Sequence, residues 1–134
     1  MATKYVLEMT DEQAAIAAAA FEFYTRMRLG QFRELVKLVV PYSDEDWLTK
    51  TTDGEDALLE ARKILLPDLA PHWGHSYGVY NFPETLDAWQ LCQAVRSCRA
   101  WQKHPEGGLT VDFDKPIPHE GKPVPVCRAV EENE

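Results

Sequence analysis

The sequence has no long hydrophobic run. None of its apolar stretches approaches the ~20 residues that a helix needs to cross a bilayer. The opening stretch, MATKYVLEMTDEQ, contains no apolar segment before a cleavage site, which a secretion signal would require. We therefore expect an intracellular protein that is neither anchored in a membrane nor exported.

Basic residues are also in short supply. The 14 lysines and arginines are outnumbered by 22 acidic residues, and the formal net charge is -8 at pH 7. This charge repels nucleic acid and anionic membrane surfaces at long range, so we expect neither as a partner. A local basic cluster can still hold a small anion, because salt screens charges beyond about 8 Å.

Metal-binding and nucleophilic motifs are missing. The three cysteines, Cys92, Cys98 and Cys127, show no CxxC spacing, which predicts reduced thiols rather than a disulfide framework. His72 and His75 could bind a metal with Asp68 or Cys92, but their spacing matches no zinc motif. Solvated or loop-bonded histidines are the simpler interpretation. We predict no metal and no cofactor.

Acidic pairs are the remaining candidates for chemistry. Asp44 with Asp46, and Asp112 with Asp114, have the composition of an acid–base or Mg²⁺ site. The first pair lies in a polar turn and the second on one side of an expected strand, so solvation explains both. We therefore predict that the protein is not an enzyme and has no catalytic residue.

The length and composition are those of one globular domain. The chain has 134 residues, of which 45% are hydrophobic and 27% charged. The predicted domain is helical with a small sheet and spans residues 1–128. Residues 129–134, which end in EENE, are predicted to form a disordered acidic tail.

Local rules place the first helix between two markers. Thr10 and Gln13 match a capping box and predict a helix that begins near residue 11. Gly30 predicts its end or a kink. The alanine-rich run over residues 14–20 indicates a close helix–helix contact or a face for self-association, so a homo-oligomer is possible.

The spacing of apolar residues, together with helix-breaking residues, predicts three further helices. Residues 31–39 are predicted to form the second helix. The third should open at residues 53–56 and end before Pro67. The fourth should run from Pro83 to about Lys103.

Two short segments favour β-strands. Residues 5–9 and 109–113 contain strand-forming residues but are too short to be stable alone. Because they flank the helical block, we expect them to pair with each other. The predicted fold class is therefore α+β, mainly α, with about four helices and a two-stranded sheet that joins the two ends.

Two sequence motifs resemble a family of small proteins of tailed phages and prophages. The first is YTR at residues 24–26, followed by GQF at 30–32. The second covers residues 88–101, with Gln93, Val95, Arg96 and the pair Ala100-Trp101, followed by PEGGLTVDFDKP at 105–116. The resemblance implies a mainly helical phage protein that acts in the host cytoplasm. Ser97 stands where the family pattern has a histidine, which argues against catalysis at that position.

Basic side chains gather near both motifs. If the first and fourth helices pack together, Arg26 and Arg96 could converge on one phosphate group. An aromatic ring nearby could stack a base. The predicted ligand-binding residues are Tyr24, Arg26, Gln31, Gln93, Arg96, Arg99 and Trp101. The alternative is that these arginines bond helix carboxylates or carbonyls and have a structural role.

The functional hypothesis joins these observations. We expect a non-enzymatic phage protein that binds and sequesters a small phosphorylated, nucleotide-type molecule, such as a host defence signal. A second hypothesis is a protein-interaction module that inhibits a host protein through its acidic surface. A third is a small hydrolase.

Overall fold

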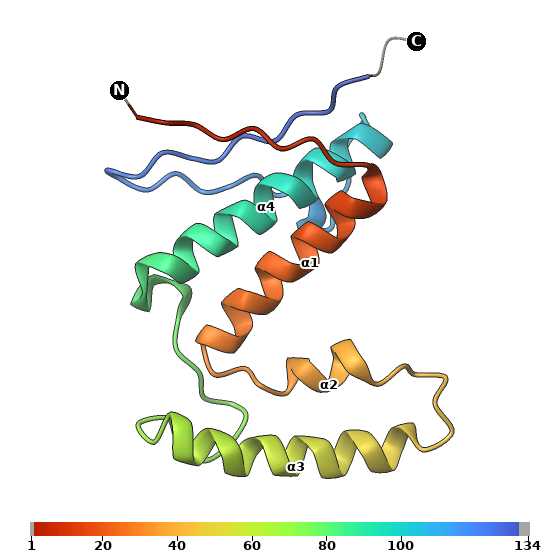
Figure 1. Ribbon diagram of the computed structural model, residues 1–134, viewed down its shortest axis with the longest axis vertical. Helices are drawn as coiled ribbons and strands as arrows, with labels where there is room; N and C mark the ends of the chain where they lie inside the picture. The colour runs from red at the N-terminus through yellow and green to blue at the C-terminus, as the bar shows by residue number, and fades with distance from the viewer. Residues whose placement is uncertain (1, 132–134) are drawn as a thin grey trace. The chain divides into compact units, whose positions relative to one another are not determined.

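The computed structural model describes residues 2–131, and within them the chain is all-α (Figure 1). Four α-helices and two short 3₁₀ helices form the regular structure of this part of the chain. In chain order they are α1 (Asp11–Arg28), α2 (Glu34–Val39), α3 (Trp47–Leu65), η1 (Val79–Asn81), α4 (Pro83–Lys103) and η2 (Val111–Phe113). The predicted α+β class is wrong, because residues 2–131 contain no β-strand.

The chain divides into two compact units. The terminal unit comprises Met1–Phe21 and Trp89–Glu134, and the middle unit comprises Glu22–Ala88. The division passes through α1 and through α4, so each of these helices contributes to both units. A single domain over residues 1–128 stays a prediction. Of the predicted acidic tail, residues 132–134 lie outside the described residues.

The ends of α1 follow the local rules of the sequence. The N–H of Gln13 donates to Thr10 Oγ1 at 3.2 Å, and the N–H of Thr10 donates to Gln13 Oε1 at 2.9 Å. After the helix, Gly30 adopts a φ of 85°, and its N–H donates to the carbonyl of Met27 at 3.1 Å. The predicted start and end of this helix are confirmed, as is the fourth helix from Pro83 to Lys103.

The third helix begins earlier than predicted. The sequence placed its start at residues 53–56, but α3 begins at Trp47. Asp44 supplies the reason, because its carboxylate accepts the N–H of Asp46 at 2.8 Å and binds Lys50 Nζ at 2.8 Å. The resulting turn leads directly into the helix.

The middle unit is built on α2 and α3, which run side by side (Figure 1). Val36 of α2 is buried and lies 3.5 Å from the position that a Cβ would occupy at Gly54 of α3. A Cβ at Gly54 would make an ordinary van der Waals contact with Val36, so the two helices lie close to each other at this point. The segment that follows α3 is tied to the end of α1, where the N–H of Tyr77 donates to the carbonyl of Leu29 at 2.9 Å.

Small side chains bring α1 and α4 together in the terminal unit. Ala14 and Ala18 of α1 are buried against Val95 of α4. Met9, from the segment before α1, and Cys127, from the C-terminal segment, pack on the same cluster. The alanine-rich run is thus a helix–helix contact, as predicted.

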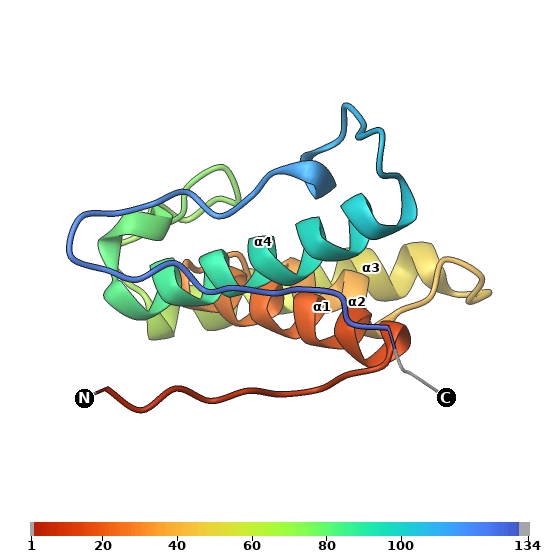
Figure 2. The same cartoon turned by 90° about the horizontal axis from the view of Figure 1, so that it is seen from above.

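The C-terminal segment lies against α4. The buried side chain of Gln90 donates through Nε2 to the carbonyl of Ile117 at 2.6 Å. Farther on, an isolated antiparallel bridge joins His119 to Lys122, and Gly121 adopts a φ of 78°. The chain reverses at this turn and runs back in extended form (Figure 2).

The two predicted strands do not pair. The end of the second segment, residues 111–113, instead forms η2, and Phe113 packs on Trp101 with ring centroids 5.4 Å apart at 89°. The indole N–H of Trp101 donates to the carbonyl of Phe113 at 3.0 Å. Gly108 leaves room for the Phe113 ring, since a Cβ there would clash with it. Residues 5–9 consequently have no strand to pair with.

Candidate functional site

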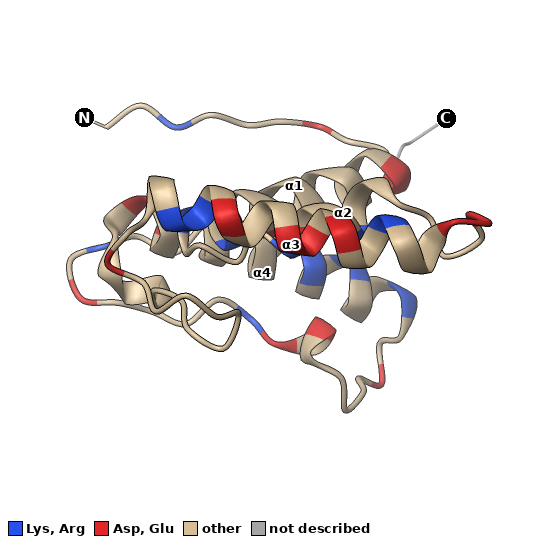
Figure 3. Ribbon diagram, turned by 90° about the horizontal axis from the view of Figure 1, so that it is seen from below, with Lys and Arg blue, Asp and Glu red and all other residues tan. Residues whose placement is uncertain are grey.

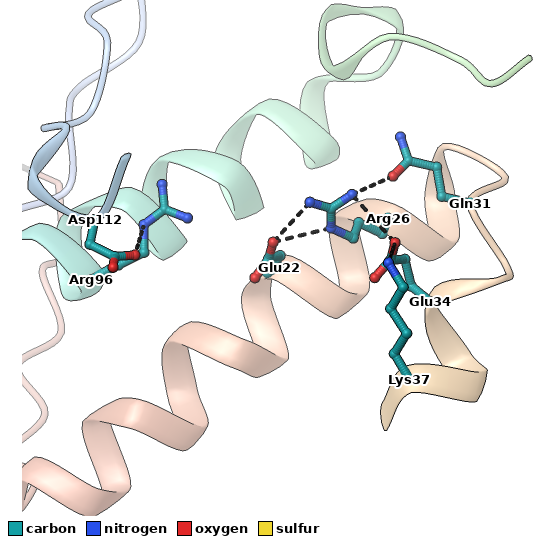
Figure 4. A network of polar contacts seen from close by, with 7 residues as sticks. All are labelled: Glu22, Arg26, Gln31, Glu34, Lys37, Arg96 and Asp112. Carbon is teal, nitrogen blue, oxygen red and sulfur yellow. Dashed lines mark hydrogen bonds and ion pairs between the residues drawn. The ribbon is translucent and has the colours of Figure 1, made fainter. Parts of the chain in front are cut away.

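Arg26 lies near the end of α1, in the middle unit, and is held by acidic and amide groups. Its guanidinium binds Glu22 at 3.0 Å and lies 3.9 Å from a carboxylate oxygen of Glu34 (Figure 4). Its Nη1 donates to Gln31 Oε1 at 2.7 Å. The positive charge is thus balanced within the unit. This matches the structural alternative, in which the arginine bonds helix carboxylates.

Of the two other predicted residues of the middle unit, Gln31 belongs to this network. Gln31 uses its amide oxygen on Arg26, and its amide nitrogen lies 3.4 Å from Ser76 Oγ. Tyr24, on α1, has 46% of its surface exposed. Arg26 Nε and Gln31 Oε1 thus already have hydrogen-bond partners within the unit.

Arg96 lies on α4, in the terminal unit, and its environment differs from that of Arg26. Its guanidinium carbon is 5.4 Å from the ring centroid of Trp89. Its Nε is buried, makes no hydrogen bond to any described residue, and lies 3.7 Å from Asp112 Oδ1 (Figure 4). That distance is too long for a hydrogen bond. Arg96 is therefore an arginine with an unsatisfied donor.

Gln93 precedes Arg96 by three residues on α4, so the two side chains share a face of the helix. Gln93 is 5% exposed, and its Oε1 is buried with no donor among the described residues. Gln90 is also buried, at 1% exposed, but donates to the carbonyl of Ile117. A buried polar atom without a partner costs about 1 to 3 kcal/mol. Gln93 and Arg96 thus present an acceptor and a donor that both lack partners.

Arg99 joins the two helices of the terminal unit. Its Nε lies 2.9 Å from Asp11 Oδ1 and its Nη2 lies 3.3 Å from Oδ2, while Lys103 Nζ approaches the same carboxylate at 3.4 Å. The hydrogen bond that Arg99 donates to Asp11 lowers the pKa of Asp11 below its ordinary value and raises the pKa of Arg99. Arg99 therefore serves to hold the start of α1 against α4.

Trp101 contributes to the fold of the segment after α4. Besides its bond to the carbonyl of Phe113, its ring would meet any side chain at Gly107, which has a φ of 85°. Lys115 Nζ lies 5.8 Å from the ring centroid. The indole thus organises the turn between α4 and η2.

The seven predicted ligand-binding residues fall into two groups. Tyr24, Arg26 and Gln31 belong to the middle unit, and the other four belong to the terminal unit. A site shared by Arg26 and Arg96 stays a prediction, because the two residues belong to different units. Within the terminal unit, Gln93 and Arg96 are the pair with unsatisfied atoms.

Arg62 is the residue that sequence reasoning missed. It is 1% exposed on α3, and its guanidinium donates to four backbone carbonyls at 2.6 to 3.0 Å: those of Gly30, Ala70, His72 and His75. It also stacks on Trp73, 4.9 Å from the ring centroid. Burial lowers the pKa of Arg62 below its ordinary value. A sequence signal existed, since Arg62 follows Leu58 and Leu59 at helical spacing and so falls in the apolar stripe of α3.

The predicted metal and acid–base candidates His75 and Asp44 have structural partners. His75 Nδ1 accepts the N–H of Ala70 at 2.7 Å, as expected for a loop-bonded histidine. Asp44 is engaged in the turn before α3, and its bond with Lys50 lowers the pKa of the Asp44 carboxyl. Among the described residues, no cluster of three or more histidine, cysteine or acidic side chains has the geometry of a metal site.

Comparisons with protein-family models, with curated proteins and with solved structures find no match for this chain. In the part of the chain that the structure covers, no helix has the length and hydrophobicity to cross a membrane.

Proposed function

We propose that this protein binds a small phosphorylated molecule of the nucleotide type along α4 and sequesters it without converting it. The observation that carries the proposal is the pair of unsatisfied buried atoms, Arg96 Nε and Gln93 Oε1. Buried polar groups are nearly always hydrogen-bonded in folded proteins. A ligand that accepts a hydrogen bond from Arg96 and donates one to Gln93 would remove the free-energy cost of leaving these two atoms without partners.

The chemistry of the two atoms selects the ligand class. A guanidinium group prefers phosphate or carboxylate oxygens, which it binds with charge-assisted hydrogen bonds. An amide oxygen such as Gln93 Oε1 needs an N–H or O–H donor. A nucleotide carries both groups, because its phosphate accepts and its ribose hydroxyls or base amino group donate.

Asp112 is the internal competitor for this site. Its carboxylate lies 3.7 Å from Arg96 Nε, and 57% of its side-chain surface is exposed on η2. An ion pair at this distance with an exposed carboxylate contributes little stability, so a phosphate can displace the carboxylate at small cost. Arg26 and Arg99, by contrast, already have carboxylates within 3.0 Å.

The expected biological setting supports sequestration rather than turnover. The resemblance of residues 24–32 and 88–116 to a phage family favours a role in an infected host. Under this proposal the ligand is a nucleotide signal of host defence, and the protein lowers its free concentration.

Calorimetric titration of cyclic nucleotides and of ADP-ribose into the purified full chain tests the proposal. Arg96→Ala should weaken the binding of whichever nucleotide the wild type binds by ~10- to 150-fold, since a hydrogen bond to a charged group contributes about 1.5 to 3 kcal/mol. Asp112→Asn should tighten binding, because it removes the competing charge. Arg26→Ala is the matched control and should bind like the wild type.

Two outcomes would count against the proposal. One is that no nucleotide binds the wild type at millimolar concentration. The other is that a nucleotide binds but Arg96→Ala and Arg26→Ala lose affinity equally, which would return the site to the shared arrangement expected from the sequence.

A second candidate function is a protein-interaction module that inhibits a host protein. The observation that favours it is a group of exposed apolar side chains around the turn between α2 and α3. They are Leu38 (61% exposed), Val39 (62%), Tyr42 (83%) and Leu48 (69%). Exposed apolar groups of this kind often mark protein contacts. Native mass spectrometry of the protein purified from infected cells separates the candidates, because it distinguishes a retained nucleotide from a retained host protein.

A further inference from the structure

The segment before α1 is extended and unpaired. Tyr5, Val6 and Leu7 are 94%, 91% and 77% exposed, although all three residue types favour strands. Within the described chain, the backbone groups of residues 2–9 form no hydrogen bond to other backbone groups. An exposed strand with free backbone donors and acceptors is a template for pairing with another chain.

The side chains of this segment alternate between two faces. In an extended chain Tyr5 and Leu7 point to the same side as Met9, while Lys4, Val6 and Glu8 point to the other. Met9 is half-buried on the Ala14, Ala18 and Val95 cluster of the terminal unit. The segment is thus anchored at one end, and Figure 2 shows it leaving the start of α1 as an extended chain.

The charges of the segment are arranged to complement a second copy. Lys4 and Glu8 are its charged residues, both are exposed, and Figure 3 shows opposite charges along this part of the chain. In an antiparallel pair centred on Val6, Lys4 of one copy faces Glu8 of the other. Tyr5 then faces Leu7, and Val6 faces itself. Two-fold symmetry repeats each favourable pair.

Other alignments lack this complementarity. A parallel in-register pair would place lysine against lysine and glutamate against glutamate, and like charges directly opposite are destabilising. An antiparallel pair shifted by one residue would place Glu8 opposite Tyr5 and leave Lys4 opposite Met9. Charge pairing and apolar pairing therefore agree on one register.

We propose that residues 3–9 pair with the same segment of a second copy of this chain, antiparallel and centred on Val6. The pairing gives the backbone groups on one edge partners and brings the three exposed apolar side chains beside apolar cross-strand neighbours. Because a ribbon of two strands is only weakly stable, the dimer forms in the micromolar to millimolar range. This interface is independent of the ligand site on α4.

Charge reversal tests the register. Sedimentation equilibrium of the full chain, from about 10 μM to about 1 mM, should show a monomer–dimer equilibrium for the wild type. Lys4→Glu and Glu8→Lys each place like charges opposite each other, so each should weaken the dimer at least about tenfold. The double variant Lys4→Glu/Glu8→Lys restores opposite charges and should dimerise within about threefold of the wild type. Both residues are exposed, and circular dichroism should show that all variants remain folded.

A wild type that stays monomeric at about 1 mM would overturn the proposal. So would a dimer that neither single variant weakens, or a double variant that does not recover. These results leave the nucleotide-binding proposal untouched, because its variants lie on α4 and η2.

Discussion

Arg62 is the residue on which the middle unit depends most. Removing its side chain leaves four carbonyls, of Gly30, Ala70, His72 and His75, without their shared donor. We expect Arg62→Ala to lower the free energy of unfolding by about 3 kcal/mol or more, because each buried unsatisfied group costs about 1 to 3 kcal/mol. Arg62→Lys should recover only part of this loss, since lysine lacks the planar fork of donors.

Chemical denaturation measures this effect, and Arg33 provides the control. Arg33 also lies over Trp73, 6.0 Å from the ring centroid, but is exposed. Arg33→Ala should change the free energy of unfolding by less than about 0.5 kcal/mol. Equal losses for Arg33→Ala and Arg62→Ala would contradict a special role for the buried guanidinium.

We expect Cys127 to make the stability of the fold depend on pH in the alkaline range. Burial and a hydrogen bond with Cys98 raise the pKa of Cys127 from 9.0 to about 11. The folded state therefore keeps the thiol protonated where the unfolded state ionises. The contribution of the protonated Cys127 thiol to the free energy of unfolding is present in full below pH 9 and is lost as the pH rises through about 11.

Thermal denaturation between pH 8 and pH 11 checks this sign. Cys127→Ala removes the thiol, so the fall in melting temperature across this range should be smaller in the variant than in the wild type. Parallel curves for the two proteins would show that the Cys127 thiol does not contribute.

Among the elements, the segment before α1 changes most between the expected and the observed fold. Pairing with residues 109–113 would have made it essential for stability. In the structure residues 2–8 are exposed, while Met9 packs on the core and Thr10 caps α1. We expect deletion of residues 2–8 to change the free energy of unfolding by less than about 1 kcal/mol. Denaturant titration of the shortened chain measures this, and unfolding of the deletion variant would contradict the exposed placement.

Local rules were sufficient for some elements and not for others. Thr10, Gly30 and Pro83 act on residues within a turn of themselves, so the limits of α1 and the start of α4 could be predicted. Phe113 departs from the strand pattern because Trp101 and Gly108 draw it inward. That contact joins residues that are separated in sequence, so the alternation of apolar and polar residues over 109–113 could not predict it.

For the candidate site, too, the sequence predicts local relations along one helix but not contacts between distant residues. The sequence could identify Gln93 and Arg96 as a donor and acceptor on one face of a helix, because their spacing alone implies it. It could not show that Glu22 and Glu34 neutralise Arg26, or that Arg62 is enclosed by carbonyls. Those facts depend on which side chains meet after the chain has folded.

At the scale of the whole molecule, three arginines of an acidic chain are held by carboxylate or carbonyl groups, and Arg96 differs from them. The net charge is -8, and Arg26, Arg62 and Arg99 are bonded to carboxylates or carbonyls. Arg96 lies beside Trp89, and its Nε is buried and unsatisfied among the described residues. The proposed function places the ligand there, in the terminal unit alone.

The most direct test of this claim is ¹H–¹⁵N NMR of side-chain N–H groups in the full chain during titration with a cyclic nucleotide and with ADP-ribose. We expect the Nε–H resonance of Arg96 and the amide resonances of Gln93 to shift together and to saturate with one of these ligands. The resonances of Arg26 and Gln90, which already have partners, should stay in place. Unchanged Arg96 and Gln93 resonances at millimolar ligand, or a saturable shift confined to Arg26, would contradict it.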